Sequence, residues 1–256
     1  MTNRIDVNCD LGETSLPWPD SDEPELMTLI SSANVACGGH AGDDASMTAV
    51  CESARNNGVA VGAQVSYPDR EHFGRVAISI ANDALADSLE RQFNDLAKIA
   101  QRSGVNVTYI KPHGALYNTV VTNPDHARVV VQLAARHGIA LFGLRDSCTA
   151  TFSRDEGVRF ISEWFADRAY LASGQLVPRS RTDALVTKPA EVRSRTLNAV
   201  RNHQVRVHND TSTVAAEFID IDFATICVHS DTPGAAHLLR AVHAALSELG
   251  VAVGAP

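Results

Sequence analysis

Short apolar segments rich in β-forming residues alternate with helical patterns along the whole chain. This alternation indicates βα units, because neighbouring parallel strands need a helical crossover between them. About seven strands can be assigned, at residues 5–8, 34–37, 59–65, 107–110, 139–143, 158–162 and 224–228. β/α barrels use about 250 residues as one unit, and the chain has 256. We therefore expect an α/β fold, a parallel β/α barrel in a single domain over residues 1–256.

Helix signals agree with this interpretation. Apolar residues recur at helical spacing over 85–100 and 235–249, which predicts helices that cover a sheet. The pairs Asn123-Pro124 and Thr232-Pro233 each place a capping residue before a proline suited to the first helical position. Residues 170–187 break the rhythm, and we expect an irregular insertion there. Residues 203–223 are β-rich without a clear helix.

Charge and composition narrow the class of partner. The formal net charge is -8, which gives no electrostatic reason to bind nucleic acid or an anionic membrane. No run approaches the roughly 18 apolar residues of a membrane span, and residues 1–10 lack the apolar stretch of a secretory signal. Five scattered cysteines form no CxxC pair. We expect a cytoplasmic protein with reduced thiols and a small-molecule substrate.

Ionisable residues gather where the predicted strands end, which in parallel β/α folds is the edge that carries the active site. Six of the seven strand ends carry titratable groups. They are Asp6, Asp10 and Glu13; His40, Asp43 and Asp44; Asp69 and Arg70; Lys111 and His113; Glu163, Asp167 and Arg168; and His229 and Asp231.

Individual residues allow more than one interpretation. His40 lies in a glycine-flanked loop, where a ligand or proton-transfer role is favoured over simple packing, and His113 is similar. Asp43 could equally cap the helix that follows it, and Asp231 could only organise the entry to the last helix. Cys9 is better explained as a core residue than as a nucleophile.

Several familiar motifs are absent: GxxxxGK[ST], GxSxG, HExxH and a GxGxxG after a strand. The chain instead resembles the LamB/YcsF family over nearly its whole length and in order. The segments that carry the resemblance are DVNCDLGE (6–13), ANVACGGHAGD (33–43), SYPDR (66–70) with FGR (73–75), YIKPHGALYN (109–118), EWFADRAY (163–170), LVPR (176–179) and CVHSDTPGA (227–235).

The resemblance implies an irregular seven-stranded β/α barrel related to glycoside hydrolases and deacetylases. It also implies the A subunit of an ATP-dependent 5-oxoprolinase, which works with B and C subunits. Such an enzyme opens 5-oxoproline or a related lactam to glutamate while ATP, a co-substrate, is cleaved to ADP and phosphate. An unstrained lactam is a poor electrophile, so activation by phosphorylation makes chemical sense.

Carried onto this sequence, the resemblance implies that Lys111 supplies positive charge to a phosphoryl or lactam oxygen and that His113 or His40 transfers protons. Asp10 and Asp231 complete the candidate catalytic set. The candidate substrate-binding residues are Asn8, Glu13, Asp43, Gln64, Tyr67, Arg70, Glu163, Arg168 and His229. Asp10, His40 and His113 together offer the carboxylate and imidazole set that divalent metal ions accept.

The chain also departs from the family pattern. Gln64 stands where members usually have histidine, and glutamine is a weak metal ligand that cannot shuttle protons. Ser230, Val76 and His72 also differ from the residues that family members usually have at these positions. Two alternatives therefore remain: a stand-alone metal-dependent hydrolase or deacetylase, and a non-catalytic binding component of the complex.

Overall fold

The computed structural model describes residues 4–207 and 218–256. Within them, seven parallel strands close into a barrel in the order β1-β2-β3-β4-β5-β6-β9, and β9 pairs with both β6 and β1. The strands are β1 (Arg4–Leu11), β2 (Ser32–Ala36), β3 (Ala60–Val65), β4 (Val107–Pro112), β5 (Ala140–Gly143), β6 (Phe160–Phe165) and β9 (Thr225–Cys227). The predicted seven-stranded parallel barrel is thus confirmed.

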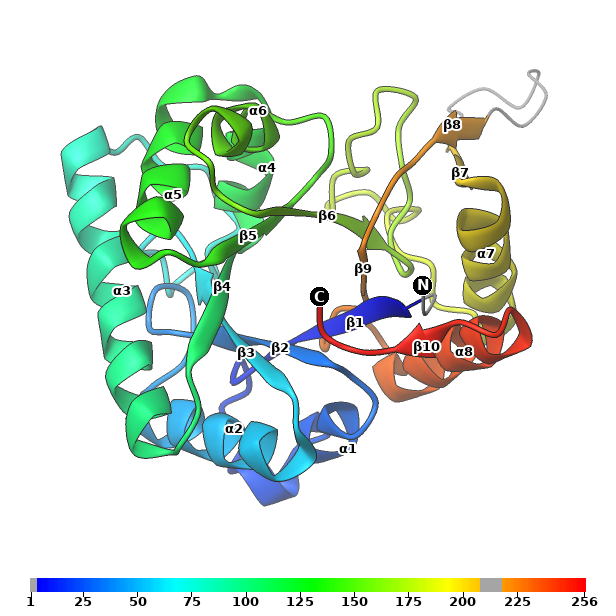
Figure 1. Cartoon of the computed structure of the whole chain (residues 1–256), viewed down its shortest axis with the longest axis horizontal. Coiled ribbons are helices and arrows are strands. Elements are labelled where there is room, and N and C mark those ends of the chain that lie inside the picture. Colours follow the sequence, from blue (N-terminus) through cyan, green and yellow to red (C-terminus); the bar gives the residue numbers. More distant parts are fainter. Residues whose placement is uncertain (1–3, 208–217) are drawn as a thin grey trace.

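Helices surround the barrel (Figure 1). They are α1 (Glu23–Met27), α2 (Asp44–Asn57), α3 (Asn82–Arg102), α4 (Gly114–Thr122), α5 (Pro124–His137), α6 (Cys148–Asp155), α7 (Pro189–Asn202) and α8 (Ala235–Glu248), with a short 3-10 helix η1 (Trp18–Asp20). Both long helices predicted from apolar spacing are present, as α3 and α8. Their buried faces carry the predicted apolar residues, such as Leu89 and Leu239.

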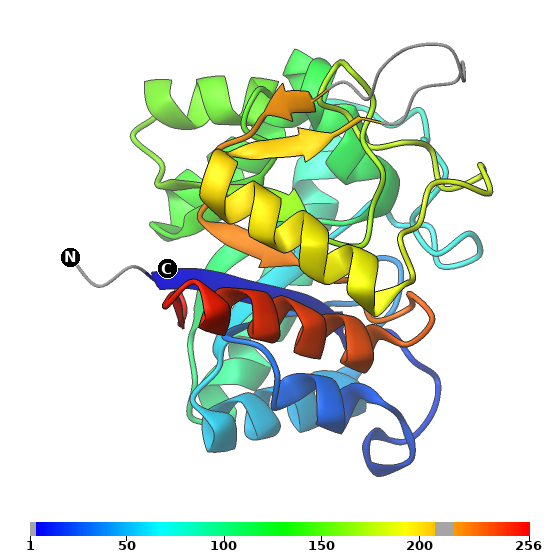
Figure 2. The same ribbon diagram turned by 90° about the vertical axis from the view of Figure 1, so that its right-hand side faces the viewer.

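The barrel is irregular between β6 and β9. The chain there passes through a segment with only isolated bridges, then α7, then the antiparallel pair of β7 (Gln204–Arg206) and β8 (Phe218–Asp220). The predicted β-rich stretch 203–223 is borne out in these strands, and residues 208–217 lie outside the described part. Helices α7 and α8 lie side by side (Figure 2), and β10 (Ala252–Val253) pairs with the start of β1.

One predicted helix start is right and the other is wrong. The side chain of Asn123 accepts hydrogen bonds from the first backbone N–H groups of α5, as a capping residue should. Thr232-Pro233 does not begin α8, which starts at Ala235 after Gly234. The Thr232 hydroxyl instead donates to the buried carboxylate of Asp167, 2.6 Å away, and no side chain caps α8.

Polar side chains fill much of the barrel interior. Strand β1 extends to Leu11, three residues beyond its predicted end, so Asp6, Asn8 and Asp10 alternate inward along one strand. All three are buried, and each accepts a hydrogen bond from a side chain of the neighbouring strand β2. Below them the ring of Tyr109 lies over Gly62, where any Cβ atom would fall 2.1 Å from the ring. The interior therefore holds a preorganised polar network rather than only apolar layers.

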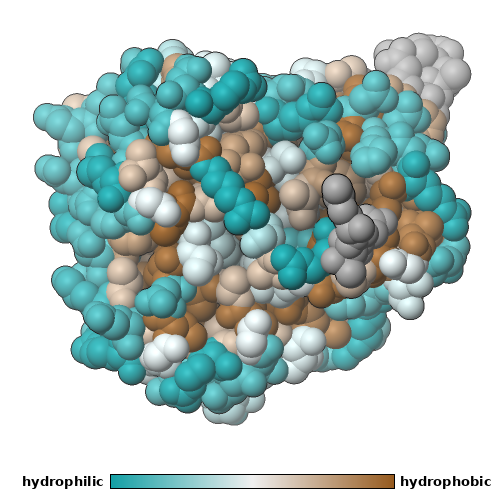
Figure 3. Space-filling model, in the orientation of Figure 1, coloured by the Kyte–Doolittle hydropathy of each residue, from teal (hydrophilic) through white to brown (hydrophobic). Residues whose placement is uncertain are grey.

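The surface shows the complementary distribution. Polar residues dominate the periphery of the face in Figure 3, and apolar residues lie nearer its middle. No helix among the described residues is both long and apolar enough to cross a membrane.

Candidate active site

A cleft of about 820 Å³ lies at the carboxyl ends of the barrel strands. Asp10, Lys111, His113 and His229 line it, although they come from β1, β4, the start of α4 and the loop after β9. Residues of the 170–187 segment and Arg75 of the β3–α3 loop form further parts of the wall. The structure thus brings an acid, an ammonium group and two imidazoles from distant parts of the chain into one cavity.

Lys111 lies at the base of this cleft and is almost fully buried. Its Nζ is 2.8 Å from Glu163 Oε1, 2.9 Å from Asn8 Oδ1 and 3.1 Å from Cys227 Sγ. An ammonium group has three donors, so these contacts use all of them. Lys111 therefore acts on the cleft through its charge, because a direct hydrogen bond to a substrate oxygen would require one of these contacts to break.

That charge acts chiefly on Asp10, whose Oδ1 lies 3.4 Å from Lys111 Nζ and also accepts from Asn34. Burial alone would raise the pKa of Asp10, but Lys111, aided by His229 and His113, holds it well below its usual range. Burial opposes the charged form of Lys111 too, yet the adjacent carboxylates raise its pKa well above the ordinary value. Asp10 is thus ionised, and its Oδ2 has no partner among the described residues.

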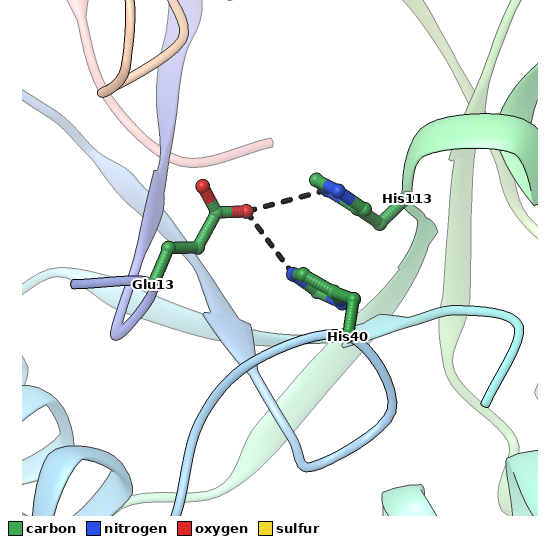
Figure 4. Close-up of side chains that lie close together, drawn as sticks. All are labelled: Glu13, His40 and His113. Atoms are coloured by element: carbon green, nitrogen blue, oxygen red, sulfur yellow. Dashed lines mark hydrogen bonds and ion pairs between the residues drawn. The ribbon is translucent and has the colours of Figure 1, made fainter. Parts of the chain in front are cut away.

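Beside this pair, one carboxylate oxygen faces two imidazole rings (Figure 4). Glu13 Oε1 is 3.2 Å from His40 Nε2 and 3.3 Å from His113 Nδ1. The two rings are stacked with centroids 3.7 Å apart. Each residue follows a different strand, β1, β2 or β4, so closure of the barrel is what assembles the cluster.

The second nitrogen of each ring is held by a partner that fixes the tautomer. His40 Nδ1 lies 3.0 Å from Ser66 Oγ, which donates its own proton to the Tyr67 carbonyl. His113 Nε2 lies 3.2 Å from the carbonyl oxygen of Phe73, which can only accept. Both facing nitrogens, His40 Nε2 and His113 Nδ1, therefore present lone pairs toward the Glu13 carboxylate.

Three lone pairs directed at one point suit a cation. Glu13, His40 and His113 are the group that meets metal-ligand geometry among residues 4–207 and 218–256. Burial, and then the neighbouring His40, lower the pKa of His113, which keeps it neutral as a ligand must be. The predicted set contained Asp10 instead of Glu13. Asp10 is not in the group, because Lys111 and Asn34 hold its carboxylate.

Gln64 adjoins the same point. Its Nε2 is 3.0 Å from His113 Nδ1, whereas its Oε1 is buried without a partner among the described atoms. Turning the amide over exchanges these two atoms and presents an oxygen to the cluster. The glutamine is therefore compatible with a bound divalent ion, although it is a weaker ligand than histidine.

Across the cleft, His229 is held by Asp167. The His229 Nδ1 atom lies 3.0 Å from Asp167 Oδ2, and the same carboxylate accepts from the His229 backbone and from Thr232. Burial would raise the pKa of Asp167, but the charge and hydrogen bonds of His229 lower it to about 2. The His229 ring also stacks on Phe165. This fixes the ring, and its Nε2 atom has no partner among the described residues.

At the mouth, Asp231 binds two arginines. Arg179 donates to both carboxylate oxygens, at 2.9 and 3.1 Å, and Arg75 donates to Oδ2. Arg75 and Arg179 line the cleft, whereas Asp231 lies behind them. The carboxylate predicted to be catalytic therefore positions two guanidinium groups.

Several residues predicted to bind substrate make structural contacts within the protein. Tyr67 is fully buried in the core and bonded to His126, because its ring points outward from the barrel. Asp43 is exposed and caps α2 through a capping box with Ser46. Arg70 donates to the carbonyls of Gly38 and Gly42. Arg168 donates to the carbonyls of Val177 and Ala184, and so holds the 170–187 segment.

The remaining predicted residues lie close to the reactive groups. Asn8 and Glu163 contact Lys111 beneath the cleft, and Glu13 joins the histidines. Three residues were not assigned a site role from sequence: Asp167, Arg75 and Arg179. Asp167 carried the strand-end signal, but nothing in the sequence paired it with His229. The arginines are on loops whose path only the fold defines.

The chain is similar to proteins of known family and structure. The model of the LamB/YcsF family matches residues 5–256. A protein of Mycolicibacterium paratuberculosis, named as the A subunit of 5-oxoprolinase, is 40% identical over 253 residues, covering 98% of each chain. The crystal structure of a lactam utilization protein from Thermus thermophilus superposes with a TM-score of 0.88 at 31% identity, covering 99% of this chain and 100% of that one.

A family 4 carbohydrate esterase from Streptomyces lividans shares the fold alone, with a TM-score of 0.52 at 9% identity over 99% of this chain and 92% of that one. This likeness bears out the predicted deacetylase-like barrel. The match of the family model to almost every residue bears out the resemblance seen in the sequence. The chain belongs to the LamB/YcsF family.

Proposed function

We propose that this chain is the A subunit of an ATP-dependent 5-oxoprolinase, which opens 5-oxoproline or a closely related lactam to glutamate. The names of its relatives support a lactam substrate and a complex of several subunits. The observation that carries the proposal is the meeting of ionised Asp10, the fixed His229 and His113 of the Glu13–His40–His113 cluster in the wall of one cleft.

The chemistry needs activation from outside this chain. Phosphorylation of the lactam oxygen by ATP makes the ring carbon a better electrophile, as the poor reactivity of an unstrained amide requires. The chain carries none of the phosphate-binding loop motifs sought in its sequence. We therefore assign ATP binding to the partner B and C subunits, and hydrolysis of the activated lactam to this cleft.

Two residues suit the proton transfers. Water that attacks the lactam carbon must lose a proton, and the free Oδ2 of Asp10 is placed to orient that water and accept the proton. The C–N bond then breaks and the ring nitrogen gains a proton, which leaves an acyl phosphate that a second water hydrolyses to glutamate and inorganic phosphate. His229 can donate the proton from Nε2, since Asp167 holds Nδ1 and stabilises the charged imidazole.

Glu13, His40 and His113 would hold a divalent ion, with Gln64 as the fourth ligand after its amide is turned over. Such an ion supplies Lewis acidity and lowers the pKa of bound water. The residues themselves contribute the fixed direction of the two imidazole ligand atoms, which Ser66 and the Phe73 carbonyl maintain.

Reconstitution tests the proposal. The chain is purified with and without the B and C subunits, and ADP release is measured with and without 5-oxoproline. We expect 5-oxoproline-dependent ADP release coupled to glutamate formation only when the complex is complete. Glutamate formation that is unchanged when this chain is omitted would contradict the proposal.

The metal-ligand cluster favours one other candidate, a stand-alone metal-dependent hydrolase or deacetylase. This activity would need neither ATP nor a partner chain. Release of acetate from N-acetylated sugar oligomers by the chain alone, abolished by a chelator, would support this second candidate over the first.

The complex is proposed to act in the cytoplasm, where its co-substrate ATP is available. The five cysteines are all free, and four of them are buried, which agrees with a reducing compartment.

A further inference from the structure

The positive charges that line the cleft differ in how far they are neutralised. The lining residues include four cations, Arg75, Lys111, Arg168 and Arg179. Lys111 contacts two carboxylates, Asp10 and Glu163. The Arg168 side chain donates hydrogen bonds to backbone carbonyls of the 170–187 segment. The two remaining arginines share a single carboxylate, so the mouth of the cleft carries an excess of positive charge.

We propose that Arg75 and Arg179 form an anion subsite that binds the carboxylate of the lactam substrate, with Asp231 as the residue that positions both guanidinium groups. This inference rests on the proposed function and assigns its specificity to named residues.

The two guanidinium groups are held in place on the side away from the cleft. Asp231 binds Arg179 in a bidentate manner and Arg75 through one oxygen. The Arg75 guanidinium also lies over the Phe73 ring, 4.8 Å from its centroid. Each guanidinium has five N–H donors, so both arginines keep donors that Asp231 does not use. Preorganised guanidinium groups suit a planar carboxylate better than a flexible ammonium would.

The same arrangement orients the ring of the substrate. In 5-oxoproline the carboxylate and the lactam carbonyl are attached on opposite sides of the ring nitrogen. With the carboxylate at the mouth, the carbonyl enters the cleft toward Asp10 and His113, and the nitrogen lies between the two ends. Phe73 connects both regions, because its carbonyl holds His113 while its ring supports Arg75. The subsite would thus place the bond to be cleaved at the reactive groups.

Binding of a matched pair of lactams tests the subsite without turnover. 5-Oxoproline and 2-pyrrolidinone, the same ring without a carboxylate, are titrated calorimetrically into wild-type chain and into Arg179→Met and Arg75→Met variants. We expect each variant to bind 5-oxoproline at least about tenfold more weakly, as loss of a charge-assisted hydrogen bond predicts, and 2-pyrrolidinone equally well. Arg179→Lys should recover part of the loss. Arg136→Met removes an arginine from a surface ion pair outside the cleft and serves as the matched control.

The outcomes separate the subsite from the proposed function. Unchanged 5-oxoproline binding in both variants, or equal weakening for both lactams, would overturn the subsite. Inorganic phosphate is titrated in parallel. If the variants lost phosphate binding but kept 5-oxoproline binding, the subsite would bind a phosphoryl group rather than a carboxylate, and the assignment would be overturned. If neither the wild-type chain nor its complex with the B and C subunits bound 5-oxoproline, the proposed function would fail. Acetate binding that depends on Arg179 would still support a carboxylate subsite.

Discussion

At the scale of single residues, the site depends on charges buried in the barrel and compensated there. Lys111 is held between Asp10 and Glu163, and all three side chains are at most 4% exposed. Buried ions cost free energy unless they are paired and hydrogen-bonded. Removing one member therefore leaves the others uncompensated.

Replacement of Lys111 by methionine should lower the free energy of unfolding by about 3–5 kcal/mol, because two buried carboxylates would lose their counter-ion. Urea unfolding at pH 7 measures the loss. Lys98→Met is the control, since Lys98 is exposed and its pair with Asp95 contributes less than about 1 kcal/mol. Similar losses in the two variants would show that the buried network does not stabilise the barrel.

Asp167 gives a prediction for pH. Its pKa in the folded state is about 2, below the ordinary 3.8, so the stabilisation it provides is complete above about pH 4 and is lost as the pH falls toward 2. The shift corresponds to about 2 kcal/mol. The stability difference between wild type and Asp167→Asn should therefore shrink by about that amount between pH 6 and pH 2. A difference that stays constant in denaturant titrations over this range would disprove the assigned ion pair.

The residue types of the site could largely be foreseen, but their grouping could not. Asp10, Lys111, His113 and His229 follow from the rule that the carboxyl ends of parallel strands carry function. The structure places Glu13 beside the two histidines, where the sequence predicted Asp10. This difference depends on the direction of the side chains at the end of β1, which sequence spacing does not define. Tyr67 has the same strand-end signal, yet its ring points into the core.

At the scale of elements, caps and strand ends determine which polar residues are free for chemistry. Asp43 and Thr232 precede helices in the sequence and looked alike there. The structure uses Asp43 as the cap of α2, whereas Thr232 supports Asp167 and leaves α8 to begin later. Local propensity predicted that a helix follows each residue. The role of Thr232, however, is determined by its hydrogen bond to Asp167, a contact between residues far apart in the sequence.

The cap role of Asp43 can be measured. Asp43→Ala should destabilise the protein by about 1 kcal/mol, because it removes the acceptor for the Ser46 backbone N–H, and Asp43→Asn should cost less. Neither change should alter the KM for 5-oxoproline in the reconstituted complex. Thermal unfolding and steady-state kinetics report the two effects. A large rise in KM without a loss of stability would restore Asp43 as a substrate-binding residue.

At the scale of the whole molecule, closure of the barrel is what creates the site. The Glu13–His40–His113 cluster joins segments that follow β1, β2 and β4, and the His229 pair joins segments that follow β6 and β9. The alternating strands and helices predicted this closure. The irregular passage from β6 to β9 was expected at residues 170–187, where the alternation breaks, whereas the orientation of the two arginines was not predictable, since it has no periodic signal.

An ion that links three strand ends should stabilise the fold, because ligands that bind only the native state raise its stability. Chain freed of metal by chelation should unfold at higher temperature after addition of Zn²⁺ or Mn²⁺, and elemental analysis should find one ion per chain. Glu13→Gln should abolish the rise, whereas exposed Glu71→Gln should not. An equal rise in both variants would place the ion elsewhere.

The most direct measurement of the central claim is glutamate formation from 5-oxoproline by the complex of this chain with its B and C subunits, compared with complexes carrying Asp10→Asn or His229→Gln. The account predicts that both variants still assemble with their partners and lose at least about a hundredfold in kcat, because each removes a proton-transfer group. Wild-type rates in both variants would contradict the assignment of lactam hydrolysis to this cleft.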